Sequence, residues 1–291
     1  MFLSLPGLVS AQKSVPKRSA DLEHIREELG VNEFTAPSID LIFDQLESLK
    51  PIPFDKAWRD LPEATPQDRT RLALSAGQVI ADGFLAVSAR KQSRLEPVGR
   101  VLLKLAKGLG IGDPITRHSR SLIELAAREQ WPQVKRELIK AQAEVEAGMM
   151  ALKDEEIAHL VSLGGWLRGL EMTASIVMEN YTPERARAVI QPELFDYFTD
   201  RLETLNPMLK KTELMGAIIK NLGLIRTLTR KPVDSPIEPA ELKQIRDLAR
   251  EQAVLDARKA QAEQLHLPPN VIESIWRLLM LASRDHQASL R

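Results

Sequence analysis

The segment Asp154–Asn180, DEEIAHLVSLGGWLRGLEMTASIVMEN, constrains the fold of this chain more than any other stretch. Its apolar residues recur at steps of three and four, which is the period of one helical face. Gly165 and Gly169 lie four apart on a neighbouring face, where the backbone of another helix could approach closely. We therefore predict a long, mostly buried helix against which the neighbouring segments pack.

Two charged residues stand within this apolar helix. Arg168 and Glu171 are three positions apart, so their side chains can meet on one face of the helix. We expect them to form a semi-buried ion pair that fixes the helix register, which is a structural role.

Prolines divide much of the rest of the chain into helical segments. Several follow Thr, Asp, Asn or Ser, residues that cap the free amides of a helix while proline takes its first position. The predicted helices span 38–49, 66–92, 95–108, 114–129, 132–153, 154–180, 183–190, 192–205, 207–230, 236–265 and 269–288, after a short one at 21–30. No segment alternates with period two. The fold class predicted is all-α: an irregular multi-helix bundle without a β-sheet, ending in a C-terminal helical hairpin.

The predicted organisation has three parts. Residues 1–20 form a signal-peptide remnant or a flexible tail, 21–234 the main helical domain, and 235–291 the C-terminal hairpin. Residues 2–9 are apolar, and Val9-Ser10-Ala11 is typical of a signal-peptidase site, although no basic residues precede it. This favours a periplasmic or secreted protein, with a cytoplasmic one as the alternative. No apolar run is long enough to span a membrane.

Composition excludes several function classes. Forty basic and forty acidic residues balance, which argues against bulk attraction to nucleic acid. The chain has no cysteine, hence no disulfide, thiolate metal site or cysteine nucleophile. Its histidines lack metal-ligand spacing, although His159 could meet Glu155, and no GxSxG motif is present. The glycine-rich stretch 107–113 lacks the lysine of a phosphate-binding loop and reads as a helix stop. We therefore predict no metal and no cofactor.

Residues 247–287, DLAREQAVLDARKAQAEQLHLPPNVIESIWRLLMLASRDHQ, carry the one sharp functional signal. They resemble the second and third helices of the all-helical (AroQ-type) chorismate mutases. The resemblance rests on residue types and spacing at Asp247, Arg250-Glu251, Val254-Leu255, the turn 267–270, Ser283 and Gln287.

The resemblance implies a cofactor-free rearrangement of a dicarboxylate substrate, which needs cations for the two carboxylates and a donor at the ether oxygen. It implies three catalytic residues: Arg250 binds a carboxylate, Glu251 bonds the substrate hydroxyl and Gln287 faces the ether oxygen. Asp247 and Ser283 would orient neighbours and substrate.

The family's long first helix supplies further cations, for which this chain offers Arg226, Arg230 and Lys231 at a spacing that does not align. A proline-rich segment, 231–239, also interrupts that helix.

Three hypotheses about function result. The first is an exported helical protein with a non-catalytic binding or structural role. The second is a chorismate mutase-like isomerase, and the third is a ligand-binding protein with a cavity lined by Met149, Met150, Met172 and Met178. The sequence leaves a protein partner or a homodimer open.

Overall fold

The computed structural model describes residues 40–152, 154–232 and 235–250, with a few positions beyond them: 268, 271, 274–276 and 278. Every regular element in this part of the chain is a helix, which confirms the all-α fold class. The predicted signal-peptide remnant at 1–20 and the helix at 21–30 lie outside the described residues. The division into domains stays a prediction.

The helices follow one another with short connections, apart from the proline-rich segment between α2 and α4. Their bounds are α2 Asp40–Ser48, α3 Phe54–Ala57, α4 Arg69–Ser88, α5 Gln92–Leu109, α6 Gly112–Ala127, α7 Trp131–Ala151, α8 Glu155–Glu179, α9 Pro183–Ala186, the 3₁₀ turn η1 Arg187–Val189, α10 Pro192–Thr204, α11 Pro207–Lys210 and α12 Glu213–Thr229. A further helical stretch occupies 239–250.

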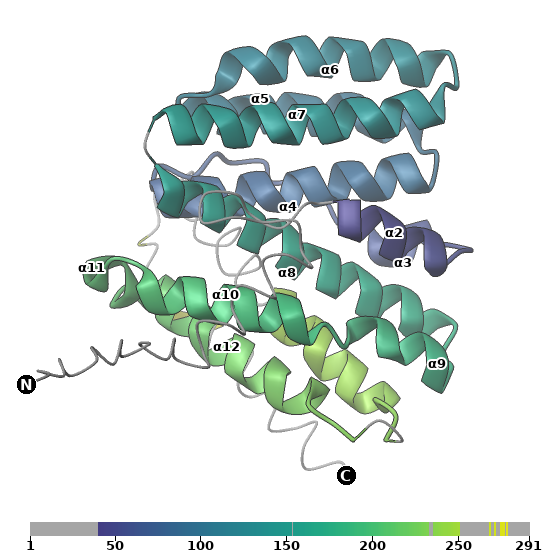
Figure 1. The fold of residues 1–291 in the computed structure, drawn as a ribbon, viewed down its shortest axis with the longest axis vertical. Coiled ribbons are helices and arrows are strands. Elements are labelled where there is room, and N and C mark those ends of the chain that lie inside the picture. The colour runs from purple at the N-terminus through teal and green to yellow at the C-terminus, as the bar shows by residue number, and fades with distance from the viewer. Residues whose placement is uncertain are drawn as a thin grey trace, which may run out of the picture.

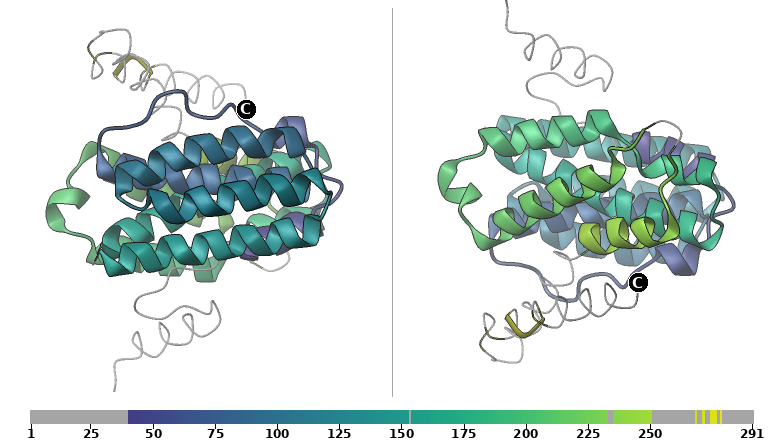
Figure 2. Two further views of the ribbon diagram at one scale, coloured as in Figure 1. Left: turned by 90° about the horizontal axis from the view of Figure 1, so that it is seen from above. Right: turned by 90° about the horizontal axis from the view of Figure 1, so that it is seen from below.

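The bundle is built in layers. In Figure 1, α6 lies at one end, followed by α5 and α7, then by α4 and α8, with α10 and α12 on the opposite side. Figure 2 shows α5, α6 and α7 covering one face, and α10, α12 and the stretch 239–250 covering the other. Helix α8 therefore lies in the interior, with α4 as its main partner.

Helix α8 is buried around almost its whole circumference, from Ile157 to Val177. A helix that is apolar on all sides is expected in the interior of a large bundle, so the predicted central helix is confirmed. Its contact with α4 is a backbone contact. A Cβ placed on Gly77 would lie 1.8 Å from the carbonyl oxygen of Val161, and one on Gly164 would lie 2.2 Å from that of Leu74. Glycine is required at both positions.

Several predicted helix boundaries were wrong. Helix α4 spans Arg69–Ser88, whereas 66–92 was predicted. Helix α5 begins at Gln92, three residues earlier than predicted, and includes Pro97. The helix predicted over 207–230 is broken into α11 and α12, because the Thr212 hydroxyl accepts a hydrogen bond from the Met215 amide and starts a new helix. The last stretch begins at 239 rather than 236, and the amide of Glu238 donates to the carboxylate of Glu241 at 2.8 Å.

The glycine-rich stretch behaves as predicted. Helix α5 ends at Leu109, and Gly110 follows with a φ of +88°, a conformation that favours glycine at the end of a helix. Helix α6 begins two residues later. The stretch is therefore a turn between antiparallel helices.

One hydrophobic core runs through all the layers. Its aromatic centre is Trp166 of α8, whose ring stacks on Phe198 and meets Phe195 edge-on, with centroids 4.8 and 4.7 Å apart. The core extends beyond α12, since Ile237, Leu242 and Ile245 are fully buried within the same cluster. None of the described helices combines the length and the apolar character that crossing a membrane requires.

Candidate functional site

A cluster of buried charges lies where α8 meets α4 and the α3 segment. The guanidinium of Arg168 donates from Nε to Asp82 at 2.8 Å and from Nη2 to the carbonyl oxygen of Ala57 at 2.7 Å. Its Nη1 lies 3.1 Å from Glu171, so the predicted ion pair between these two residues is confirmed. The pair is fully buried, with the Arg168 side chain 1% exposed.

Arg59 completes the cluster from the segment after α3. It donates to Glu171 at 2.9 Å and to the side-chain oxygen of Gln78 at 2.9 Å. Two arginines therefore face two carboxylates, and the four charges cancel. Such geometry satisfies buried charges that would otherwise be strongly destabilising.

The two arginines respond differently to burial. Burial disfavours the charged form of Arg168, but the carboxylates of Asp82 and Glu171 outweigh it and raise its pKa. For Arg59, burial and then the nearby charge of Arg168 lower the pKa. Arg168 is therefore the electrostatic centre of the cluster and Arg59 its weaker member.

Arg250 reaches this cluster from the C-terminal stretch. Its Nε lies 3.7 Å from Oε1 of Glu171, and its side chain is 48% exposed. That distance is an ion-pair contact rather than a hydrogen bond. The first of the predicted catalytic residues thus lies at the edge of the buried network, with a half-exposed side chain.

The other predicted cations lie in different places. Arg226 forms an ion pair with Asp196 of α10. Lys231 pairs with Glu241 and donates to the carbonyl oxygen of Pro236 at 3.0 Å. Arg230 is exposed. The described contacts do not gather these three cations and Arg250 into one pocket.

Of the predicted orienting residues, only Asp247 can be placed. Its carboxylate accepts two hydrogen bonds from Arg246, at 2.8 and 3.0 Å, and lies 3.5 Å from Lys243. It therefore organises cations on its own helix. Glu251, Ser283 and Gln287 lie outside the described residues.

His159 does not meet Glu155. Its Nδ1 instead forms a hydrogen bond of 2.9 Å with the hydroxyl of Tyr197 in α10. Burial, with a smaller contribution from the charge of Arg201, lowers the pKa of His159 to about 4, so the ring is neutral at pH 7. Across the described residues, no cluster of His, Asp and Glu is suited to hold a metal ion.

The methionines predicted to line a cavity are core residues where their side chains are described. Met149 and Met172 are fully buried, and Met178 packs against the same cluster. The side chain of Met150 lies outside the described part. Packing accounts for the three that can be placed.

Sequence reasoning missed Asp82 and Arg59 as partners of the central helix. A signal for Asp82 was present, since it is the only charged residue in the run LALSAGQVIADGFLAV of α4, where a lone carboxylate requires a buried cation. Arg59 lies in an irregular segment, where no periodicity indicates which residues turn inward.

Comparison with known protein families gives one finding. The model of the family "Chorismate mutase type II" matches residues 226–288, which is less than a quarter of the chain's 291 residues. The match covers every predicted site residue, from Arg226 to Gln287. No curated protein and no solved structure matches the chain. The C-terminal segment is therefore similar to the type II, all-helical chorismate mutases.

Proposed function

We propose that this protein is a chorismate mutase-like isomerase that converts chorismate to prephenate at a site built on its C-terminal helices. The observation that carries the proposal is the family match over 226–288. That segment contains the residue types that the reaction needs, at the spacing of the family: Asp247, Arg250-Glu251, Ser283 and Gln287.

The reaction breaks one carbon–oxygen bond and forms one carbon–carbon bond within a single molecule. The protein has to hold a dicarboxylate in a compact conformation and to stabilise negative charge at the ether oxygen. By similarity to the family, Arg250 binds a carboxylate, Glu251 the hydroxyl and Gln287 the ether oxygen. The reaction requires no cofactor.

The position of Arg250 is compatible with this role. The side chain is half-exposed, and among the residues that the structure describes its ion pair is a 3.7 Å contact with Glu171. A guanidinium has five N–H donors, so one contact with Glu171 leaves donors for a bidentate bond to a substrate carboxylate. For Arg226 and Lys231 to take part, each would have to exchange its carboxylate partner in the protein for the substrate.

A second candidate function is a non-catalytic binding or structural role. One observation favours it: Arg226, Lys231 and Arg250 face three separate carboxylates of the chain, those of Asp196, Glu241 and Glu171. Cations that are neutralised in this way form no ready site for a dianion.

Loss of chorismate absorbance, with detection of prephenate, distinguishes the two candidates when purified full-length protein is assayed. The isomerase proposal expects turnover, and it expects Arg250→Gln to lower kcat/KM by about 10- to 100-fold, because a charged hydrogen bond to a substrate carboxylate is lost. Arg100→Gln is the matched control, because Arg100 is an exposed arginine of α5 paired only with Glu96 in its own helix. If the wild-type protein does not convert chorismate, the isomerase proposal is wrong and the non-catalytic role is favoured.

A further inference from the structure

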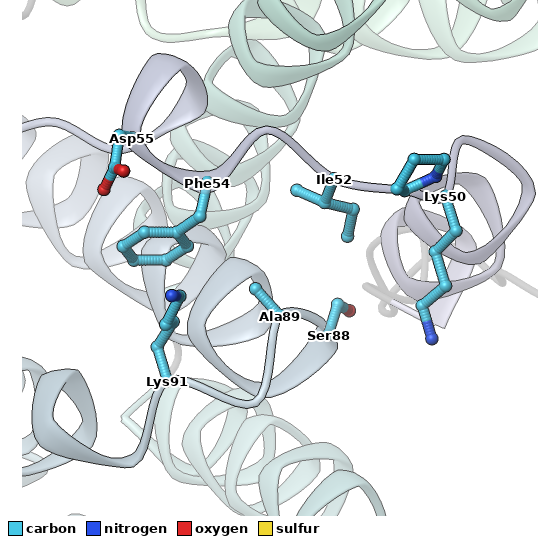
Figure 3. A pocket seen from close by; sticks show the side chains of 8 residues that line it. Lys50, Ile52, Phe54, Asp55, Ser88, Ala89 and Lys91 are labelled. Atoms are coloured by element: carbon cyan, nitrogen blue, oxygen red, sulfur yellow. The ribbon is translucent and has the colours of Figure 1, made fainter.

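An open groove lies between the connection of α2 to α3 and the turn from α4 to α5. Its volume is about 750 Å³. The side chains that give it chemical character are Lys50, Ile52, Phe54, Asp55, Ser88 and Lys91. Figure 3 shows them arranged around the end of α4.

The groove has an apolar wall. Phe54 is 7% exposed and belongs to the core, and Ile52 packs against that core from the connecting segment. Ala89 lies across the groove from them (Figure 3). This wall is suited to a hydrocarbon or aromatic body, since burying apolar surface is favourable and requires no particular orientation.

A buried hydroxyl lies in the same groove. Ser88 is 7% exposed, and its Oγ has no hydrogen-bond partner among the residues that the structure describes. A buried hydroxyl without a hydrogen bond destabilises the folded state, because it has lost its bonds to water and gained none in the protein. In Figure 3 Ser88 lies on the Lys50 side of Ala89, at the end of the groove away from Asp55 and Lys91.

The charge of the lining favours an anion. Lys50 and Lys91 both border the groove, and the Nζ of Lys91 lies 5.3 Å from the centre of the Phe54 ring. Lys91 also precedes the first residue of α5, whose amides have no side-chain cap, so the positive end of that helix dipole adds to the field. Two carboxylates lie nearby: that of Asp55 lies beyond Phe54 from Ser88 in Figure 3, and that of Glu47 pairs with Lys50 at 2.7 Å.

We propose that this groove binds a small organic carboxylate with an apolar body. The carboxylate accepts hydrogen bonds from the Ser88 hydroxyl and the Lys50 ammonium, which exchanges its partner Glu47 for the ligand. The body lies along Ala89 and Ile52 towards Phe54, and Lys91 borders the far end. The lining residues lie outside the segment 226–288, so the proposal does not depend on the activity of that segment.

The test is titration of the full-length protein with 3-phenylpropanoate, followed by NMR shifts of the ligand. The neutral analogue 3-phenylpropanol is titrated in parallel. We expect the carboxylate to bind at least about tenfold more tightly than the alcohol, the usual advantage of charge-assisted hydrogen bonds over neutral ones. Equal affinities, or no binding of the carboxylate, would overturn the proposal.

Variants locate the site. Lys50→Met is expected to weaken binding about tenfold and Ser88→Ala about fivefold, in line with loss of a charged and a neutral donor. Lys56→Met is the matched control, because Lys56 is an exposed lysine of α3 that pairs with Glu179 and does not line the groove. Ser88→Ala removes an unpaired hydroxyl, so its melting temperature should not fall. A loss of binding in Lys56→Met equal to that in Lys50→Met would place the ligand elsewhere.

Discussion

Glycines and arginine–carboxylate ion pairs occur in two regions of this protein, the α4–α8 interface and helix α12, and they differ there in how deeply they are buried. Between α4 and α8, Gly77 and Gly164 bring two backbones into contact, and Arg168 is buried with its carboxylates. On α12, a Cβ added to Gly216 or Gly223 would meet nothing within 4 Å among the described residues, and Arg226 pairs with Asp196 at a half-exposed position.

The difference teaches that residue type alone does not set energetic importance. A glycine is required where a Cβ would clash with the backbone of a neighbouring helix. Where no such neighbour exists, a glycine only weakens its own helix. An ion pair is critical where water cannot replace a lost partner and minor where water can. The α4–α8 interface therefore determines stability, whereas the α12 side of the bundle tolerates change.

The largest expected difference concerns the carboxylates. Asp82→Ala leaves Arg168 buried with only part of its compensation and should lower the free energy of unfolding by about 3–5 kcal/mol. Asp196→Ala removes the partner of a half-exposed Arg226 and should cost less than about 1 kcal/mol. Urea unfolding of both variants measures the contrast. Similar losses would mean that the two ion pairs do not differ as their burial indicates.

The glycines give the next contrast. Gly77→Ala places a methyl group 1.8 Å from a carbonyl oxygen of α8, so the helices must separate, at a cost of about 3 kcal/mol. Gly216→Ala adds the methyl group to open space inside a helix and should stabilise the protein by about 0.5–1 kcal/mol. Melting temperatures should move in opposite directions. A stabilised Gly77→Ala variant would contradict the backbone contact.

Gly165→Leu extends the comparison within α8. A Cβ on Gly165 would lie 3.3 Å from the carbonyl oxygen of Gly77, which is tight, and the rest of a leucine side chain would have to enter the interface. The cost expected is about 1–3 kcal/mol. A variant that kept its stability but lost a measured activity would show that α8 has a functional role beyond packing.

A further effect depends on pH and concerns the contact between α8 and α10. Because burial lowers the pKa of His159 to about 4, the folded state favours the neutral ring, whereas the unfolded state takes up a proton near pH 6.5. The stability present above pH 6.5 is therefore lost as the pH falls towards 4, by about 3 kcal/mol. His159→Gln should remove that part of the pH dependence between these values. An unchanged slope would mean that other groups cause it.

Part of the candidate site was readable from the chain. Arg168 and Glu171 stand three apart in an apolar helix, and that spacing was sufficient to predict their ion pair. The residue types from Asp247 to Gln287 were sufficient for the resemblance that the family match over 226–288 confirms. Helix starts were predicted less well where a hydroxyl, such as that of Thr212, competes locally for the backbone amides.

The sequence by itself determined the helical class, the buried central helix and the similarity of the C-terminal segment, because periodicity, capping and motif spacing are local properties. Only the tertiary structure decided that Gly77 meets Gly165 and Gly164 meets Leu74, that Asp82 and Arg59 complete the charge cluster around Arg168, and that Arg250 reaches Glu171. It also brought Ser88 and Lys50 into the lining of one groove. These contacts join residues far apart in the chain, and their energies depend on the burial that only packing creates.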